Sequence, residues 1–317
     1  MNPEKQKQAG EIISEILKIA PFLKVENRSD LSEFFSHFYE NLTEYAEISF
    51  SPYDPVIGVM TRCVQVDQIT GYLKDRIPEK TLAVALDAAG RFPGAPVMIK
   101  QDFGEAEVFD FTLYWQVLVP LNLTLNLARR HNFYKEENEI FKELMLLLRS
   151  DKVYTGLSLT SEGVSGFRVF FSNPLKQSAS YFAPAFSSVM TRLGLDARAI
   201  NYFIGLHNFL APAAHGQLFT SIALDGKRPA GVKLDYEIIP PAYAVETMNA
   251  LEIPASQIER FINILNVLQM KNVTYLSLKF APGKLPTLKI YLDRRFSTKN
   301  SENPEVLANF LRNTTWT

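Results

Sequence analysis

The chain has 317 residues, of which 47% are hydrophobic and 12% aromatic, and its 33 lysines and arginines nearly balance 34 aspartates and glutamates. This length buries a large core, and the near-neutral charge excludes a protein that binds nucleic acid through a broad basic face. No apolar stretch reaches the roughly 18 residues of a membrane span, and the single cysteine, Cys63, can form no internal disulfide, so we expect a cytoplasmic protein without a membrane partner.

Two kinds of segment alternate along the chain, after an N-terminal stretch that mixes acids and bases and is unlike a signal peptide. Paired runs of alternating polarity, joined by turn residues rich in Gly and Pro, predict five β-hairpins. The predicted strand pairs are 46–50 with 56–66, 97–103 with 110–119, 153–160 with 166–172, 217–224 with 232–239, and 273–280 with 287–292. The longer stretches between them, such as 136–148 and 257–270, have helical spacing. We therefore predict repeated αββα units within a single domain of residues 1–317.

Each predicted strand has one apolar face and one polar or aromatic face. In 287–292, Leu288, Ile290 and Leu292 share one face, whereas Lys289 and Tyr291 share the other. The helices need an apolar surface to cover, so the polar face must turn away from them. An open sheet would leave that face bare and two edges unpaired, whereas a closed barrel encloses it. The predicted fold class is α+β: a ten-stranded antiparallel β-barrel with a solvent-filled lumen, surrounded by helices.

Strand alternation also predicts which side chains line this lumen. The hydrogen-bond donors are Arg62, Lys100, Tyr114, Gln116, Arg168, Lys233, Lys289 and Tyr291, and the aromatic surfaces are Tyr154, Phe170, Phe219 and Tyr275. Five cations from different strands would repel one another in a low-dielectric enclosure unless an anion joined them. Arginine, lysine and tyrosine suit phosphate oxygens, and aromatic faces stabilise cations. The lining therefore predicts a polyanionic ligand.

A group of cations beside an aromatic cage meets the requirements for ionising an allylic diphosphate. The leaving group is neutralised while the carbocation is shielded from water. An electron-rich aromatic ring can then attack the carbocation, and a base removes the ring proton. This combination predicts a prenyl-transferring enzyme with small-molecule substrates.

The second strands of three hairpins share a cation followed by a hydrophobic residue, with an aromatic residue two or three positions after the cation. They read FRVFFS at 167–172, VKLDY at 232–236 and LKIY at 288–291. Over about residues 45–294 this pattern resembles the ABBA or PT-barrel aromatic prenyltransferases, and it looks closest to cyanobacterial indole prenyltransferases of the hapalindole and ambiguine kind. The resemblance implies transfer of a dimethylallyl or geranyl group from its diphosphate to a carbon of an indole-type acceptor, in alkaloid-type secondary metabolism.

The resemblance also implies roles for individual residues. The diphosphate would be bound by Arg62, Lys100, Tyr114, Arg168, Lys233, Lys289 and Tyr291. The acceptor would be bound by Glu47, Tyr154, Phe170, Phe219 and Tyr275, with Glu47 and Arg168 as the catalytic pair. In the family the second hairpin usually carries a lysine before an aromatic residue and a proline. The corresponding segment here, 111–120 (FTLYWQVLVP), contains no lysine. Either Lys100, or Tyr114 together with Gln116, would take its place.

No metal site is predicted from the residues. A DDxxD-type run is absent, so the magnesium cluster of chain-elongating prenyl synthases is not expected, and the four histidines lack metal-ligand spacing. Some ABBA members use one Mg²⁺ that bridges the diphosphate, and the sequence leaves that requirement open. We expect no nucleic-acid partner and a monomer or weak dimer.

Three alternatives stay open at the level of the sequence. A closed barrel could bind an isoprenoid or phosphorylated ligand without chemistry. It could also be a cyanobactin-like peptide prenyltransferase, although residues 303–317 are long enough to cover the barrel end that a macrocycle would need. For Glu47, the alternative to a catalytic role is an edge strand with its carboxylate in water.

Overall fold

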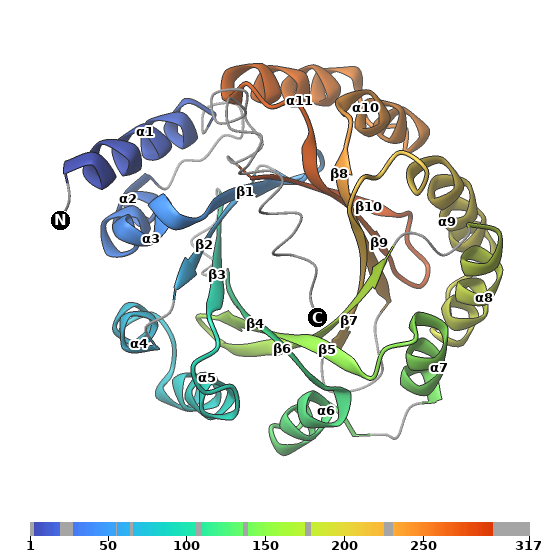
Figure 1. Ribbon diagram of the computed structural model, residues 1–317, viewed down its shortest axis with the longest axis horizontal. Coiled ribbons are helices and arrows are strands. Elements are labelled where there is room, and N and C mark those ends of the chain that lie inside the picture. Colours follow the sequence, from blue (N-terminus) through green and yellow to red (C-terminus); the bar gives the residue numbers. More distant parts are fainter. Residues whose placement is uncertain are drawn as a thin grey trace.

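The computed structural model describes residues 3–19, 28–54, 56–63, 66–104, 110–135, 139–174, 179–224 and 231–293. In these residues ten antiparallel strands form a closed barrel in the order β1-β10-β9-β8-β7-β6-β5-β4-β3-β2. The helices lie around the outside of this barrel (Figure 1). The predicted ten-stranded barrel surrounded by helices is therefore confirmed.

The strands follow the predicted hairpins closely. They are β1 (Ala46–Phe50), β2 (Ile57–Cys63), β3 (Val97–Phe103), β4 (Asp110–Pro120), β5 (Lys152–Thr160), β6 (Gly163–Pro174), β7 (Gln217–Leu224), β8 (Val232–Ile239), β9 (Val273–Phe280) and β10 (Thr287–Asp293). The pair β7 and β8 has the predicted bounds. Strand β2 is shorter than predicted because the next helix already begins at Val66, and β6 begins three residues earlier, at Gly163.

Two helices separate each hairpin from the next in the described part of the chain. The helices are α1 (Pro3–Ile19), α2 (Arg28–His37), α3 (Tyr39–Glu44), α4 (Val66–Leu73), α5 (Glu79–Arg91), α6 (Leu121–Arg130), α7 (Glu139–Leu148), α8 (Ala179–Arg192), α9 (Ala197–Leu210), α10 (Pro241–Ala250) and α11 (Ala255–Leu268). None of these helices is both long and apolar enough to cross a membrane.

The hydrophobic core lies between the outer face of the barrel and the helices. Phe34 of α2 contacts Tyr72 of α4 at a ring distance of 6.0 Å and Phe103 of β3 at 5.7 Å. On the other side of the barrel, Phe203 of α9 lies 6.0 Å from Phe280 of β9. Each fully buried side chain of this kind contributes about 1.5–3 kcal/mol to folding. The outer layer therefore supplies the stability, and the lumen is left for polar groups.

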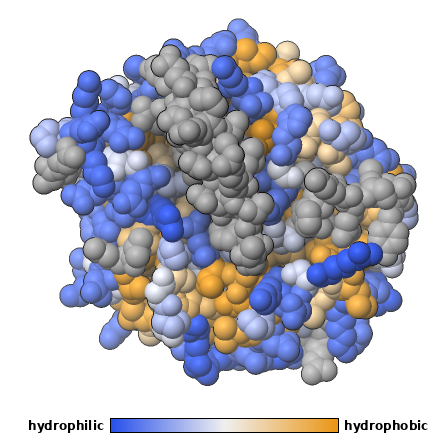
Figure 2. All heavy atoms as spheres, viewed as in Figure 1, coloured by the Kyte–Doolittle hydropathy of each residue, from blue (hydrophilic) through white to orange (hydrophobic). Residues whose placement is uncertain are grey.

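The face seen down the barrel axis is mostly hydrophilic around its rim. Figure 2 shows hydrophobic side chains there only in separate patches among the coloured residues. This distribution agrees with a core that lies inside the ring of helices, because apolar surface buried there is withdrawn from solvent.

Helix α9 makes one of several polar contacts between the helix layer and the barrel wall. Helix α9 begins at the N-cap Asp196, whose side chain accepts a hydrogen bond from the backbone N–H of Ala199 at 2.8 Å. Near its other end, His207 Nδ1 lies 3.0 Å from the hydroxyl of Tyr236 on β8. Burial lowers the pKa of His207 to about 4. The imidazole is therefore neutral at pH 7.

We predict that this histidine makes the fold sensitive to mild acid. The pKa of His207 in the folded protein lies below its value of about 6.5 in the unfolded chain. Between these two pKa values the unfolded chain binds the extra proton. The stability that is present above pH 6.5 is therefore lost as the pH falls toward 4. Between pH 7 and pH 5 the wild type should lose about 2 kcal/mol more than His207→Gln, which keeps a hydrogen-bond partner for Tyr236. Urea unfolding at both pH values measures this difference, and equal losses in the two proteins would contradict it.

Candidate active site

The lumen contains a cavity of about 200 Å³ whose walls come from all ten strands. The cavity is lined by Tyr45, Glu47, Met60, Met98, Tyr114, Trp115, Gln116, Tyr154, Phe170, Phe219, Lys233, Asp235, Tyr275 and Tyr291. Most of these belong to the face that strand alternation assigns to the interior. The structure therefore brings together predicted residues from segments far apart in sequence.

Aromatic rings form a continuous series along the cavity wall. Tyr154 lies 6.5 Å from Phe219, Phe219 lies 6.0 Å from Tyr275, and Tyr275 lies 6.3 Å from Tyr291, measured between ring centroids. Burial raises the pKa of Tyr154, Tyr275 and Tyr291, so their hydroxyls stay protonated and can donate hydrogen bonds. The wall thus combines π-faces with neutral donors.

A glycine makes room for a second aromatic pair. Tyr114 and Phe170 meet edge to face at 5.5 Å. A Cβ atom at Gly156 would lie 3.1 Å from Phe170, 3.2 Å from Tyr114 and 3.3 Å from the Cβ of Arg168. Even an alanine at Gly156 would therefore crowd these three residues.

Lys233 is compensated by a carboxylate on its own strand. Its Nζ lies 2.9 Å from Asp235 and 3.4 Å from the hydroxyl of Tyr291. The ammonium also lies 5.2 Å from the centroid of the Tyr291 ring. Burial opposes the charge on Lys233, but Asp235 outweighs that effect, and the pKa of Lys233 is raised. Lys233 is therefore a cation at neutral pH.

A second group of charges joins β3 and β10 across the lumen. Asp102 forms an ion pair with Lys100, and both of its oxygens lie 3.4 Å from Nζ of Lys289. Burial would raise the pKa of Asp102, but the two lysines overcome this and lower it strongly. A Cβ atom at Gly58 would collide with Asp102, Ser49 and Lys100, so the ion pair occupies the space that this glycine leaves.

Arg168 differs from the three lysines. Its half-buried side chain has no ion pair and no hydrogen bond within the described ranges. Burial works against its charge, but Tyr114 and Tyr291, and then Asp110 and Asp102, raise the pKa of Arg168 above its ordinary value. A guanidinium that is charged, enclosed and unpaired can accept an anionic ligand at little cost.

Arg62 lies apart from this group. It is the last residue but one of β2, and its side chain is exposed. Within the described part of the chain, that side chain forms no ion pair or hydrogen bond. The structure therefore brings Lys100, Arg168, Lys233 and Lys289 into the interior and leaves Arg62 at the rim.

Two buried carboxylates, Glu47 and Glu237, lie close enough to Tyr275 for both charges to raise the pKa of its hydroxyl. Glu47 is only 1% exposed and accepts a hydrogen bond of 2.7 Å from the hydroxyl of Tyr45. Glu237 accepts hydrogen bonds from the backbone N–H of Gln217 at 2.7 Å and from the hydroxyl of Tyr275 at 3.1 Å. The edge-strand alternative for Glu47 is wrong, because β1 pairs with both β2 and β10 and the barrel has no edge there.

Two carboxylates that compensate the cations were not predicted from the sequence. The sequence indicates five inward cations without counter-ions, whereas Asp102 and Asp235 form ion pairs with three lysines. The signal was present, because each aspartate follows a lysine by two residues and so shares its face. The need for an external anion therefore rests on Arg168 rather than on all five residues.

The described residues hold no group of three or more histidine, cysteine or carboxylate side chains that could bind a metal ion. The inward carboxylate nearest the lysines, Asp102, lies between two ammonium groups that would repel a divalent cation. The lumen in this arrangement does not fit a bridging Mg²⁺ held by Asp102.

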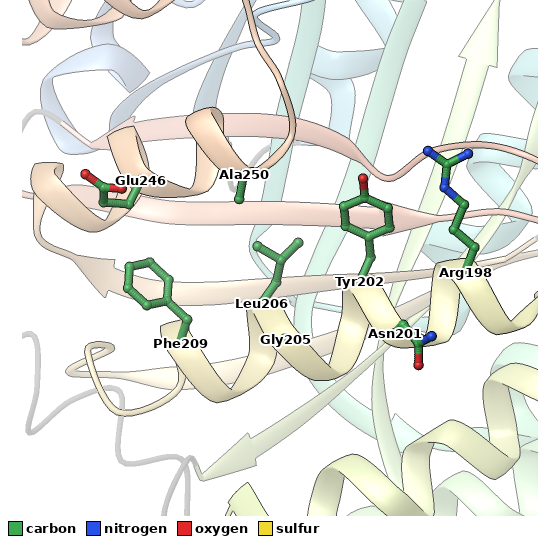
Figure 3. A pocket seen from close by; sticks show the side chains of 8 residues that line it. All are labelled: Arg198, Asn201, Tyr202, Gly205, Leu206, Phe209, Glu246 and Ala250. Atoms are coloured by element: carbon green, nitrogen blue, oxygen red, sulfur yellow. The ribbon is translucent and has the colours of Figure 1, made fainter.

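A larger hollow of about 720 Å³ lies outside the barrel, between α9 and α10. Glu246 and Ala250 of α10 face Tyr202, Leu206 and Phe209 of α9 across it (Figure 3). It contains none of the predicted site residues. The smaller cavity inside the barrel, with its charged and aromatic lining, is the better candidate for chemistry.

Comparison with known proteins relates the chain to solved structures alone. No model of a protein family and no curated protein matches the sequence. The structure of NotF with brevianamide F and DMSPP has a TM-score of 0.67 at 10% identity and covers 89% of this chain and 92% of that chain. The structure of 5-dimethylallyl tryptophan synthase from Streptomyces coelicolor with DMASPP and Trp has a TM-score of 0.65 at 14% identity. It covers 92% of this chain and 96% of that chain.

The apo form of the prenyltransferase PriB is similar to the same extent. It gives a TM-score of 0.63 at 12% identity and covers 91% of this chain and 97% of that chain. At sequence identities this low, the structural similarity establishes the fold and nothing more. The predicted resemblance in fold is confirmed. The chain has the PT-barrel fold of the aromatic prenyltransferases.

Proposed function

We propose that this protein is an aromatic prenyltransferase that moves a prenyl group from its diphosphate to a carbon of an indole-type acceptor. The observation that carries the proposal is the charged, unpaired guanidinium of Arg168, whose side chain meets Tyr114 and Phe170 of the aromatic cavity wall around Gly156. The fold supports it, since the similar structures include prenyltransferases solved with tryptophan and dimethylallyl thiolodiphosphate. The prenyl group of the proposal is dimethylallyl or geranyl.

In the proposed reaction the C–O bond of the allylic diphosphate breaks, and both bonding electrons leave with the diphosphate. Arg168 and Lys233 stabilise the departing charge, with Lys100, Lys289, Tyr114 and Tyr291 contributing ammonium groups and hydroxyls. Arg62 is the least supported member of this set, because its side chain is exposed at the rim. An enclosed site keeps water from capturing the carbocation.

The acceptor then supplies the new C–C bond. Its ring lies between Tyr154, Phe170, Phe219 and Tyr275, whose π-faces also stabilise the carbocation by roughly 0.5–2 kcal/mol each. The attacking ring carbon gains the prenyl group, and the proton on that carbon passes to Glu47, which is buried at the same cavity. Both reactants are small molecules.

We further propose a single domain of residues 1–317 that acts in the cytoplasm as a monomer or weak dimer. Buried Cys63, whose thiol donates to Gln68 at 3.3 Å, is compatible with a reducing compartment. Residues 303–317, which bear on the alternative of a peptide acceptor, lie outside the described residues.

We predict that the protein releases diphosphate from dimethylallyl diphosphate when an indole acceptor is present. The product should gain the mass of one dimethylallyl group in place of hydrogen, measured by mass spectrometry with and without Mg²⁺ and with geranyl diphosphate in parallel. Binding of the diphosphate without any alkylated product across indole, tryptophan and tyrosine acceptors would favour the non-catalytic alternative. Alkylation of a macrocyclic peptide alone would favour the peptide prenyltransferase.

We predict that Arg168→Ala lowers turnover by at least about 100-fold while the protein stays folded, since it removes a charged group that stabilises the leaving diphosphate. Arg168→Lys should recover part of the loss, because it keeps the charge but not the planar fork. Arg198→Ala, an exposed arginine of α9, is the matched control and should keep full turnover. Wild-type turnover in Arg168→Ala would remove Arg168 from the site.

We predict that Glu47→Gln lowers turnover by about 100-fold or more, because glutamine still accepts the Tyr45 hydrogen bond but cannot take a proton. Glu237→Gln, a second buried carboxylate near Tyr275, is the matched control. Steady-state kinetics with dimethylallyl diphosphate and indole measures both. An equal loss in the two variants would show that the site needs negative charge there, and not that Glu47 is the base.

A further inference from the structure

We propose that Asp102 is an internal counter-ion that holds Lys100 and Lys289 in the free protein and competes with the diphosphate for them. This inference rests on the proposed function, since it concerns how the same lumen admits and releases its anion. Asp102 would thus set the affinity for diphosphate without touching the reacting carbon.

The contacts of Asp102 support this role. Its side chain is 17% exposed, and those of Lys100 and Lys289 are 6% and 28% exposed. Within the described ranges, every hydrogen bond of the Asp102 carboxylate goes to one of these two lysines. The carboxylate therefore stands where a phosphate oxygen would have to be to contact both ammonium groups.

The other compensating carboxylate is held differently. Asp235 pairs with Lys233 and also accepts a hydrogen bond from the hydroxyl of Ser277 on the neighbouring strand. That second contact fixes Asp235 when Lys233 turns toward a ligand. Asp102 has no such hydroxyl partner in the described part of the chain, so it can leave the lysines without losing a neutral hydrogen bond.

Electrostatics makes the competition unavoidable. Two ammonium groups that share one carboxylate are crowded, and burial and then Lys100 lower the pKa of Lys289 although Asp102 opposes this. An anion with several charges would relieve that crowding more than one carboxylate does, but it would repel Asp102 itself. Once the diphosphate has left, Asp102 can pair again with both lysines, which favours release of the product.

Binding of inorganic diphosphate, measured by calorimetry without added metal, tests the proposal. Asp102→Asn should bind at least about tenfold more tightly than the wild type, because both lysines lose their competing anion. Asp75→Asn is the control for the loss of one negative charge: Asp75 is exposed in the turn after α4 and forms no ion pair with either lysine. Its affinity should stay within about threefold of the wild type.

Unchanged or weaker binding by Asp102→Asn, or an equal gain in Asp75→Asn, would overturn the proposal. The proposed function would survive if the wild type binds diphosphate and Arg168→Ala does not. If neither the wild type nor any variant binds diphosphate, both the role of Asp102 and the proposed function are contradicted. Should Asp102→Asn fail to fold with two uncompensated lysines, comparing Lys100→Met with Lys100→Met/Asp102→Asn repeats the test with one buried cation fewer, and the double variant should again bind more tightly.

Discussion

The compensation of buried positive charge is the constraint on which the interior of this barrel depends. Closing the sheet forces every second side chain into an enclosed space, and four of those side chains are cations. An isolated ammonium or guanidinium in such a space costs several kcal/mol unless it is paired. Asp102 and Asp235 supply that pairing for the lysines, and the apolar layer outside the barrel supplies the stability that tolerates Arg168.

Partial compensation links folding to binding. A lumen with every cation paired would hold no attraction for a diphosphate, whereas one with every cation free would strongly destabilise the fold. Here Arg168 can contact an anion directly, whereas the lysines can do so only after their ion pairs with Asp102 and Asp235 break. The initial attraction and the final affinity of an anion would therefore come from different residues of the same site.

The sequence predicts the strands of the barrel more accurately than it predicts how the charges inside the barrel pair. Alternation is a local property, so the bounds of β7 and β8, and the inward direction of Lys233 and Lys289, could be read directly from it. The pairing of Lys289 with Asp102 joins residues 187 positions apart and depends on how the closed sheet is staggered. The exposure of Arg62 likewise depends on where β2 ends, and strand ends are poorly determined by pattern.

Small residues on the inner face explain why the lumen has usable space at all. Gly58 leaves room for the Asp102–Lys100 pair, and Gly156 leaves room for Tyr114 and Phe170 to approach Arg168. Both glycines lie on strands where alanine would serve the backbone better, because glycine weakens a strand interior. Their presence on the cation-bearing face therefore indicates a packing requirement of the site, and it could have been recognised from the sequence once the inward face was assigned.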